Sequence, residues 1–350
     1  MCYTFIFKKQ FTTMKKYCFL LIACCVFMAR FTKVSAQQNL YTLDKKIAIP
    51  GNGGYDYLFI DQQARKLYVS HGTAINVINL DTEELVGTID NLQGDHGVAV
   101  VPGVGKGFIS DGKANAVVAF DLKTLKVIKT IPLTGKKPDA IIYDAFSNKI
   151  IAFNGGSDNA SFIDVNNLIE TNIVALNGAP EFAAADGKGK VYVNIEDKNN
   201  LKAIDTKTFK VVSTYPLTPC GGPTGLAMDA VNKRLFTVCR ENKGMSVIDM
   251  ISGKIIATIP IGAGVDAVAY DAVTKLIFCS NGDATTTTII KQETADKYSA
   301  LQTLETQIKA KTLALDTKTH KIYLSVADFT PGTKNAIPNS FKVLVYKMVK

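Results

Sequence analysis

The sequence predicts an all-β fold, a seven-bladed β-propeller with four antiparallel strands per blade and a last blade closed by the N-terminal strand. Three observations lead to this prediction. A pattern recurs seven times at intervals of 40 to 45 residues. Each copy contains short β-rich runs separated by turn residues, and the last copy lacks one run that an orphan run before the first copy can supply. Repeats of this length are typical of propellers.

Residues 1–36 have the composition of an export signal. They hold six basic residues and no acidic one, and the apolar run 17–29 follows Lys15 and Lys16. The segment ends in the small residues Ser35 and Ala36, a pattern that favours cleavage there. An apolar run of 13 residues is too short to favour a membrane span. We therefore expect a signal peptide over 1–36, one propeller domain over 37–350, and a periplasmic or extracellular protein.

The leader has a second interpretation. Residues 21–24, Leu-Ile-Ala-Cys, also fit a bacterial lipoprotein signal, which would anchor the chain through Cys24. The apolar residues 25–28 that follow argue against lipidation, so cleavage after Ala36 is favoured.

Removing the leader changes the charge of the chain. The full sequence has a formal net charge of +9, whereas residues 37–350 hold 34 basic and 31 acidic side chains. A mature charge of +3 gives no electrostatic indication of a nucleic-acid partner.

The repeats begin at equivalent positions along the chain. Each opens with a short step that in most copies ends in aspartate, and a turn then leads to a basic residue and an apolar strand, as in 66–69 and 190–193. A third run commonly ends in aspartate, as in 118–121, and a fourth follows, as in 126–132. The seven copies start at Asp56, His96, Asp139, Glu181, Thr224, Asp266 and Lys311.

The two ends of the mature chain complement each other. The last copy finishes at 341–348 without a fourth run, and the orphan run 41–49 precedes the first copy. Pairing the two would close the ring and protect two strand edges that would otherwise stay open.

The repeats resemble the YVTN-type β-propeller family in its YncE-like bacterial branch. The residues that carry the resemblance are 138–144 (PDAIIYD), 190–197 (KVYVNIED), 223–227 (PTGLA) and 264–267 (GVDA). The resemblance runs from about Tyr41 to the C-terminus and implies the propeller fold. It does not imply a chemistry, because propellers host many unrelated functions.

The two ends of the predicted ring differ. At one end the turns are short and uniform, and their aspartates, Asp144, Asp229 and Asp271, are interpreted as turn formers. His320 lies in a turn at that end and is expected to be solvated. At the other end the loops vary in length and chemistry, and 326–340 form a long loop that is either a lid or an irregular excursion. Functional residues concentrate on such loops, so we expect the site at this variable end.

The first strand of each blade lines the central channel, which places the seven repeat starts as a ring at its mouth. Crowded carboxylates raise one another's pKa unless a cation compensates. The ring is a water-filled structural channel, a ligand site or a metal site, and no cofactor is assigned. Oxygen-rich ligands favour Ca²⁺ or Mg²⁺, while His96 admits a transition metal.

Loops after the second strands add candidates at the same end, namely His71, Asp111, Asn154, Glu196, Arg240 and Asn281. Glu196 and Arg240 can pair with each other. No catalytic motif is present, and no metal ligand is assigned. The predicted ligand-binding set is Asp56, His71, His96, Asp139, Glu181, Glu196, Thr224, Arg240, Asp266, Asn281 and Lys311.

The mature chain keeps three cysteines. Cys220 precedes the first strand of the fifth repeat and Cys239 ends its second strand, so antiparallel pairing brings both to one end. A disulfide is possible there if the Cα atoms lie within about 7 Å. Cys279 is expected to be buried in a strand.

These observations favour a non-enzymatic, exported binding module, expected to be a monomer, for a small molecule, a glycan or a protein. A propeller lactonase or other hydrolase that uses histidine, arginine and carboxylates is the alternative. A redox or copper-linked role is a third hypothesis, but the sequence has no dedicated metal ligands and no haem-attachment motif. The hydrolase alternative is favoured if His71 or His96 lies near Arg240 and Glu196 at a pocket.

Overall fold

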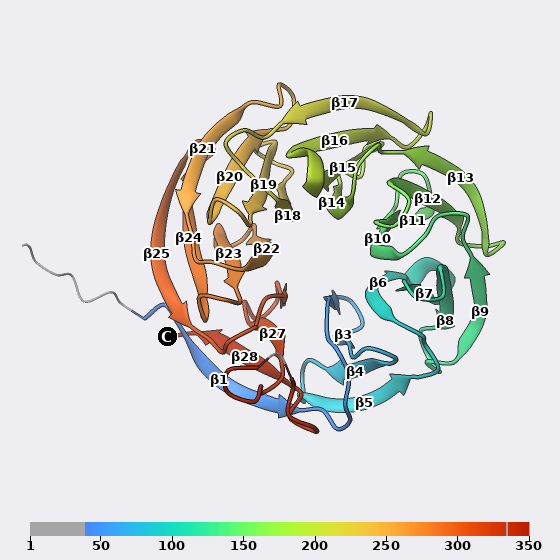
Figure 1. Cartoon of the computed structure of the whole chain (residues 1–350), viewed down its shortest axis with the longest axis horizontal. Coiled ribbons are helices and arrows are strands. Elements are labelled where there is room, and N and C mark those ends of the chain that lie inside the picture. The colour runs from blue at the N-terminus through green and yellow to red at the C-terminus, as the bar shows by residue number, and fades with distance from the viewer. Residues whose placement is uncertain (1–38, 334, 350) are drawn as a thin grey trace, which may run out of the picture. The chain divides into compact units, whose positions relative to one another are not determined.

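The computed structural model describes residues 39–333 and 335–349, so the predicted signal peptide lies outside the described residues. One compact unit spans Asn39–Lys350. Its described residues form seven four-stranded antiparallel sheets arranged as a ring (Figure 1). The predicted seven-bladed β-propeller is confirmed. No helix in the described ranges is long and apolar enough to cross a membrane.

Each blade runs from an inner strand to an outer strand. Blade 1 contains β2 (Leu58–Asp61), β3 (Lys66–Ser70), β4 (Ile75–Asn79) and β5 (Glu84–Ile89). Blade 2 contains β6 (Asp95–Val101), β7 (Lys106–Asp111), β8 (Ala116–Asp121) and β9 (Val127–Pro132), with the 3-10 helix η1 (Pro102–Val104) after β6. Blade 3 contains β10 (Pro138–Asp144), β11 (Lys149–Asn154), β12 (Asn159–Asp164) and β13 (Ile169–Ala175).

Blades 4 to 6 repeat this order. Blade 4 contains β14 (Pro180–Ala185), β15 (Lys190–Ile195), β16 (Asn200–Asp205) and β17 (Lys210–Pro216), with the 3-10 helix η2 (Glu196–Lys198) after β15. Blade 5 contains β18 (Pro223–Asp229), β19 (Arg234–Cys239), β20 (Gly244–Asp249) and β21 (Ile255–Pro260). Blade 6 contains β22 (Val265–Asp271), β23 (Leu276–Asn281), β24 (Thr286–Thr294) and β25 (Lys297–Glu305).

Blade 7 combines both ends of the described chain. It contains β26 (Leu313–Leu315), β27 (Ile322–Val326), β28 (Lys342–Met348) and, as its outer strand, β1 (Tyr41–Ala48). The β1–β28 ladder runs antiparallel from Tyr41 opposite Met348 to Ala48 opposite Lys342. The ring closure predicted from the orphan run is therefore confirmed.

The core lies between neighbouring blades. Middle strands such as β11 and β27 are buried along nearly their whole length, because both of their faces pack against an adjacent blade. Outer strands such as β13 alternate between more and less exposed residues, because one face meets solvent. Burial at a period of two thus explains why the outer run of each repeat carries more polar residues.

The short turns at one end are held by aspartates. The carboxylates of Asp144, Asp229 and Asp271 each accept backbone N–H groups two and three residues further along the chain. Their predicted role as turn formers is confirmed. The expectation that His320 is merely solvated is wrong, because its Nδ1 lies 2.6 Å from Oδ2 of Asp271 and its side chain is partly buried.

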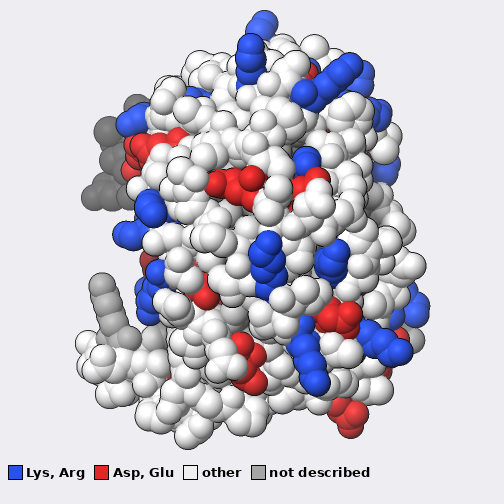
Figure 2. Space-filling model, turned by 90° about the vertical axis from the view of Figure 1, so that its right-hand side faces the viewer, with Lys and Arg blue, Asp and Glu red and all other residues white. Residues whose placement is uncertain are grey.

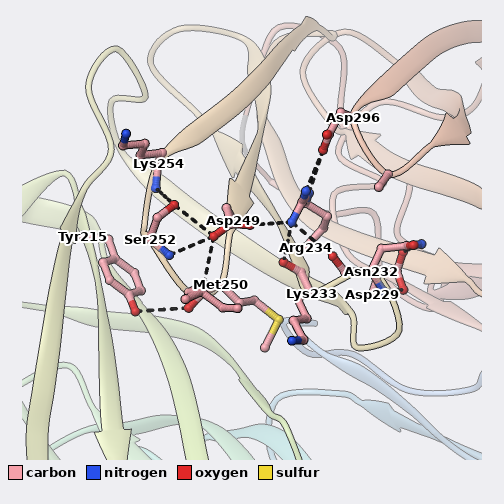
Figure 3. A network of polar contacts seen from close by, with 12 residues as sticks. Tyr215, Asp229, Asn232, Lys233, Arg234, Asp249, Met250, Ser252, Lys254 and Asp296 are labelled. Atoms are coloured by element: carbon pink, nitrogen blue, oxygen red, sulfur yellow. Dashed lines mark hydrogen bonds and ion pairs between the residues drawn. The ribbon is translucent and has the colours of Figure 1, made fainter.

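Blade 6 has long outer strands whose hairpin reaches back to blade 5. At the tip of the β24–β25 hairpin, Asp296 accepts hydrogen bonds from Arg234 at 3.0 and 2.7 Å, and Arg234 also donates to Asp249 at 2.6 Å. Figure 3 shows this network, in which Asp249 also caps the turn that holds Ser252. The network fixes blades 5 and 6 to each other at the end with the short turns.

If β1 closes the ring, Tyr41 should contribute strongly to the stability of the fold. Tyr41 is 1% exposed, packs edge-to-face on Phe278 at 5.2 Å and donates a hydrogen bond to the carbonyl of His320. Tyr41→Ala should lower the free energy of unfolding by about 3–5 kcal/mol, as for other buried aromatic truncations. Urea denaturation of the chain from residue 37 measures it. Leu43→Ala on the same strand is the control, since Leu43 is 43% exposed. Equal losses in both variants would contradict closure through β1.

Candidate functional site

The mouth of the channel is built on a recurring bulge. In β10, Pro138 pairs with Asn154 and Ile141 with Ala152, so the inner strand holds one extra residue. The same irregularity occurs at the start of β6, β14, β18 and β22. Bulges bend a strand and redirect side chains. The residues within them are the predicted ring positions His96, Asp139, Glu181, Thr224 and Asp266.

Buried hydrogen bonds between blades hold the backbone of these positions. Ser110 of blade 2 donates to the carbonyl of Asp139 in blade 3, and Ser280 of blade 6 donates to that of Lys311 in blade 7. Asn194 of blade 4 donates to the carbonyl of Thr224 at 2.7 Å. In each case a side chain on a second strand fixes a ring residue of the next blade.

His96 joins two carboxylates at one side of the mouth. Its Nδ1 lies 2.7 Å from Oδ2 of Asp56 and 3.4 Å from Oδ1 of Asp139. Burial lowers the pKa of His96, but the hydrogen bond to Asp56 and the charges of Asp139 and Asp56 outweigh it and raise the pKa above its usual value. Burial and the charge of Asp56 raise the pKa of Asp139 to about 6.

Two permanent cations hold the other side of the mouth. Lys311 donates to Asp266 at 2.7 Å and lies 3.8 Å from Asp56. Arg240 donates to Asp266 at 2.6 Å and to Glu196 at 2.7 Å. The structure therefore places Glu196 and Arg240 in contact with each other and, through Asp266, in one ionic chain with the ring.

Glu181 differs from the other carboxyl groups because it forms no hydrogen bond or ion pair with a described residue. Burial, together with the charges of Asp139, Glu196 and Asp266, raises the pKa of Glu181 to about 9. At neutral pH its carboxyl group is therefore protonated and can donate a hydrogen bond.

Two aromatic side chains meet beside the ring positions. Tyr57 follows Asp56 in blade 1 and Phe182 follows Glu181 in blade 4, and their ring centroids lie 4.6 Å apart. Phe182 also packs against the cores beside blades 5 and 7. This aromatic contact therefore joins blades 1 and 4 next to the ring positions.

A pocket of about 400 Å³ opens beside His96, between blades 2 and 3. We call it the His96 pocket. Neither Lys113 nor Lys137 in its wall forms an ion pair with a described residue. A Cβ at Gly112 would lie 2.7 Å from Nε2 of His96, so a side chain there would displace the imidazole. The lining residues are His96, Gly112, Lys113, Asn115, Lys137, Asp139 and Gly155.

Several predicted residues do not reach the mouth. His71 is 5% exposed, stacks on Phe341 at 4.2 Å and has its Nδ1 3.1 Å from Oδ1 of Asn76. Asn281 is fully buried and donates to Thr286 and Thr288 within its own blade. Thr224 is also fully buried, and its Oγ1 has no hydrogen-bond partner among the described residues.

A difference in register explains which loop residues reach the mouth. Asp111, Asn154 and Asn281 pair directly with the first residue of the inner strand, as Ile195 and Cys239 do in blades 4 and 5. Glu196 and Arg240 follow one residue later. Because successive side chains of a strand point to opposite faces, that one-residue difference separates buried positions from positions at the mouth.

Five residues at the mouth and its pocket were not predicted from the sequence, namely Tyr57, Phe182, Gly112, Lys113 and Lys137. The aromatic pair was visible as two large side chains immediately after ring positions, but a repeat alignment does not show that they meet across the ring. The two lysines lie in the variable loops that the analysis favoured, and only the packing of blades 2 and 3 brings them to one pocket.

Cys220 and Cys239 form a disulfide in the structure. Their Cα atoms lie 5.1 Å apart, within the limit of about 7 Å for a disulfide. Cys279 is fully buried in β23, as expected.

The long loop 327–340 of blade 7 contains a bridge between Phe329 and Ala336. Its Asn339 contacts Asn52, so the loop packs against the segment that leads into blade 1.

Comparison with known proteins places this propeller among its relatives. A family model described as YNCE-like beta-propeller matches residues 112–273. The resemblance to YncE-like propellers is confirmed. The YncE protein of Salmonella typhi is 23% identical over 299 residues, which cover 79% of this chain and 83% of that protein. Antigen Lp49 of Leptospira interrogans is 28% identical over 150 residues, or 42% of this chain and 32% of that protein.

Solved structures share the fold at low sequence identity. The β-propeller domain of Myceliophteria thermophila Cps50 (Swd1) superposes with a TM-score of 0.72 at 9% identity, covering 88% of this chain and 100% of that chain. The WD40 repeats of RRP9 give a TM-score of 0.72 at 7% identity, covering 89% and 98%. A chain of the mitotic checkpoint complex gives 0.74 at 11%, covering 91% and 95%. These likenesses extend to the fold alone.

The raised pKa of Glu181 predicts a pH-dependent stability. A carboxyl group whose pKa rises from 4.5 to about 9 on folding contributes stability below pH 4.5 that is lost as pH increases toward 9. Glu181→Gln should therefore become more stable than the wild type as pH rises, by more than about 1 kcal/mol between the two limits. Urea denaturation across this range tests it. The exposed Glu84 supplies the control Glu84→Gln, which should follow the wild type, and parallel curves for Glu181→Gln would contradict the assignment.

Proposed function

We propose that this chain is an exported binding module that takes a small molecule into the mouth and the His96 pocket. The carrying observation is the pocket of about 400 Å³ whose wall joins two unpaired lysines to the carboxylate of Asp139. A volume of this size suits a small organic ligand. The basic, acid-free leader over 1–36 supports export to the periplasm or the exterior.

The charges of the site favour a ligand with both an anionic and a polar or cationic end. Lys113 and Lys137 offer ammonium groups for a carboxylate or phosphate at the outer part of the pocket. Asp139 and Glu181 offer an acceptor and a donor toward the channel. Charge-assisted hydrogen bonds of this kind are stronger than neutral ones and orient a ligand. A small amino acid, hydroxy acid or phosphorylated compound has this polarity.

Another side of the molecule is a weaker candidate for the ligand site than the mouth. On the side of the molecule that Figure 2 shows, basic and acidic side chains are interspersed among uncharged ones. That side therefore presents no field of one dominant sign that would attract a charged ligand.

The proposal predicts a specific effect of the two lysines. In a thermal-shift screen of small carboxylic acids and phosphate esters on the chain from residue 37, at least one class should stabilise the wild type. Lys113→Ala with Lys137→Ala should weaken its binding at least tenfold, because two charge-assisted contacts are lost. Lys188→Ala with Lys254→Ala, two exposed lysines in turns at the opposite end, is the control. Equal affinity in both double variants would refute the site.

A hydrolase of the lactonase type is the second candidate, and one observation favours it. His96 Nδ1 is held by Asp56 at 2.7 Å, while Nε2 lies against Gly112 in the wall of the pocket. An imidazole oriented by a carboxylate and open on its other nitrogen is the arrangement of a general base. His71 takes no part in this candidate, because it is buried under Phe341.

The hydrolase candidate predicts turnover that depends on His96. A broad lactone and ester screen should reveal a substrate whose kcat falls at least a hundredfold in His96→Gln, the usual range for a positioned general base. His320→Gln is the matched control, because His320 also pairs through Nδ1 with an aspartate but at the opposite end. No turnover in the wild type, or the same loss in both variants, would leave binding as the surviving function.

A further inference from the structure

Three groups that commonly bind metals converge at the His96 side of the mouth. One ligand atom each from Asp56, His96 and Asp139 lie within 4.8 Å of one another. They come from the consecutive blades 1, 2 and 3, so the packing of neighbouring blades, and not a local motif, brings them together. This explains why a search of the sequence for metal motifs does not detect them.

The protein alone does not satisfy all three groups. The imidazole Nδ1 carries one proton, and Asp56 accepts it at 2.7 Å. Oδ1 of Asp139 is buried and has no hydrogen-bond partner among the described residues, although Nδ1 lies 3.4 Å away. An unpaired buried carboxylate oxygen is costly, and a bound cation removes that cost.

The spacing suits a small divalent ion. Zinc binds nitrogen and carboxylate oxygen at about 2.0–2.2 Å, and tetrahedral geometry then separates neighbouring ligands by about 3.3–3.5 Å. The 3.4 Å between Nδ1 of His96 and Oδ1 of Asp139 matches that separation. The shorter contact between Nδ1 and Asp56 is the hydrogen bond that the ion would replace, with loss of the Nδ1 proton.

The backbone around the cluster is fixed before any ion binds. Thr312 donates to the carbonyl of Asp56 at 2.6 Å, and Ser110 donates to the carbonyl of Asp139. The absence of a side chain at Gly112 lets the imidazole of His96 lie where Nδ1 faces both carboxylates. Preorganised ligands lower the entropic cost of binding an ion.

The donor set selects the class of metal. Calcium takes six to eight oxygen ligands and magnesium a near-octahedral oxygen shell, whereas this cluster offers two carboxylates and one imidazole nitrogen. Imidazole with carboxylates suits zinc and neighbouring divalent transition metals, and three protein ligands leave an open position. His96 and Asp139 also line the His96 pocket, so that position is accessible to a ligand held by Lys113 and Lys137.

We propose that Asp56, His96 and Asp139 form a binding site for one divalent transition-metal ion, with Zn²⁺ as its probe, whose open position receives the anionic group of the pocket's ligand. The metal site stands on this cluster alone. The coordinated ligand rests on the proposed function.

Isothermal titration with Zn²⁺ tests the site on the chain from residue 37, without a histidine tag and after treatment with a chelator. The wild type should bind one ion, and His96→Gln and Asp139→Asn should each weaken binding at least tenfold. His320→Gln is the matched control, because its Nδ1 lies 2.6 Å from Asp271 and no second carboxylate of the described residues forms an ion pair with it. Circular dichroism and thermal unfolding establish that the variants fold.

A spectroscopic measurement separates the site from adventitious binding. Co²⁺ should give a visible absorption band of low coordination number in the wild type and in His320→Gln, and the band should vanish in His96→Gln. No Zn²⁺ binding, or equal affinity in all variants, overturns the metal site. So does a loss in His320→Gln as large as that in His96→Gln.

The Lys113→Ala and Lys137→Ala double variant distinguishes failure of the metal site from failure of the proposed function. It should keep Zn²⁺ and lose the organic anion. Zinc binding with no anion that depends on these lysines would retain the metal site and reject the proposed ligand function. Binding of a lysine-dependent anion at equal affinity with and without Zn²⁺ would retain the function and reject coordination by the metal.

Discussion

The mouth of this propeller depends on one interaction, a buried hydrogen bond from a side chain of one blade to the backbone carbonyl of a ring residue in the next. Ser110, Asn194 and Ser280 each make it from a second strand. It fixes the backbone of the ring positions Asp139, Thr224 and Lys311, and it couples each of the three blades that donate to the blade that follows. Breaking it leaves a buried carbonyl without a partner, which typically costs about 1–3 kcal/mol.

Fixed backbone positions bring like charges together in a partly buried space. Lys311 and Arg240 form ion pairs with Asp266, whereas Asp139 and Glu181 form no ion pair with a described lysine or arginine, and burial and neighbouring carboxylates raise their pKa values. The two sides of the mouth therefore differ. On one side the carboxylate is neutralised by ion pairs, and on the other a proton or a bound cation would stabilise the carboxyl groups. These perturbed carboxyl groups, next to a pocket whose two lysines form no ion pair with a described residue, are the physical basis for placing a ligand there.

The repeat pattern was sufficient to predict seven blades, the closing strand β1 and the turn role of Asp144, because each follows from spacing and strand pairing. Ring membership was also predictable, since equivalent positions of equivalent blades converge on the axis. Burial of Thr224 and the paired state of His320 were not, because each depends on the neighbours that packing supplies. The candidates from the loops after the second strands came from two positions that are one residue apart. The buried His71 and Asn281 were therefore grouped with Glu196 and Arg240, which lie at the mouth.

The asymmetry of the mouth follows from one position in each of blades 2 to 5. In these blades the last residue of the second strand pairs with the first residue of the inner strand, and the position in question comes one residue later. In blades 4 and 5 that position holds Glu196 and Arg240, which form an ion pair with each other. In blades 2 and 3 it holds Gly112 and Gly155, and the space that their missing side chains leave is part of the His96 pocket. A Cβ at Gly112 would meet Nε2 of His96 at 2.7 Å, so the pocket and the placement of His96 against both carboxylates require the same glycine. Pocket, imidazole orientation and candidate metal ligands are therefore one structural feature of blades 1 to 3.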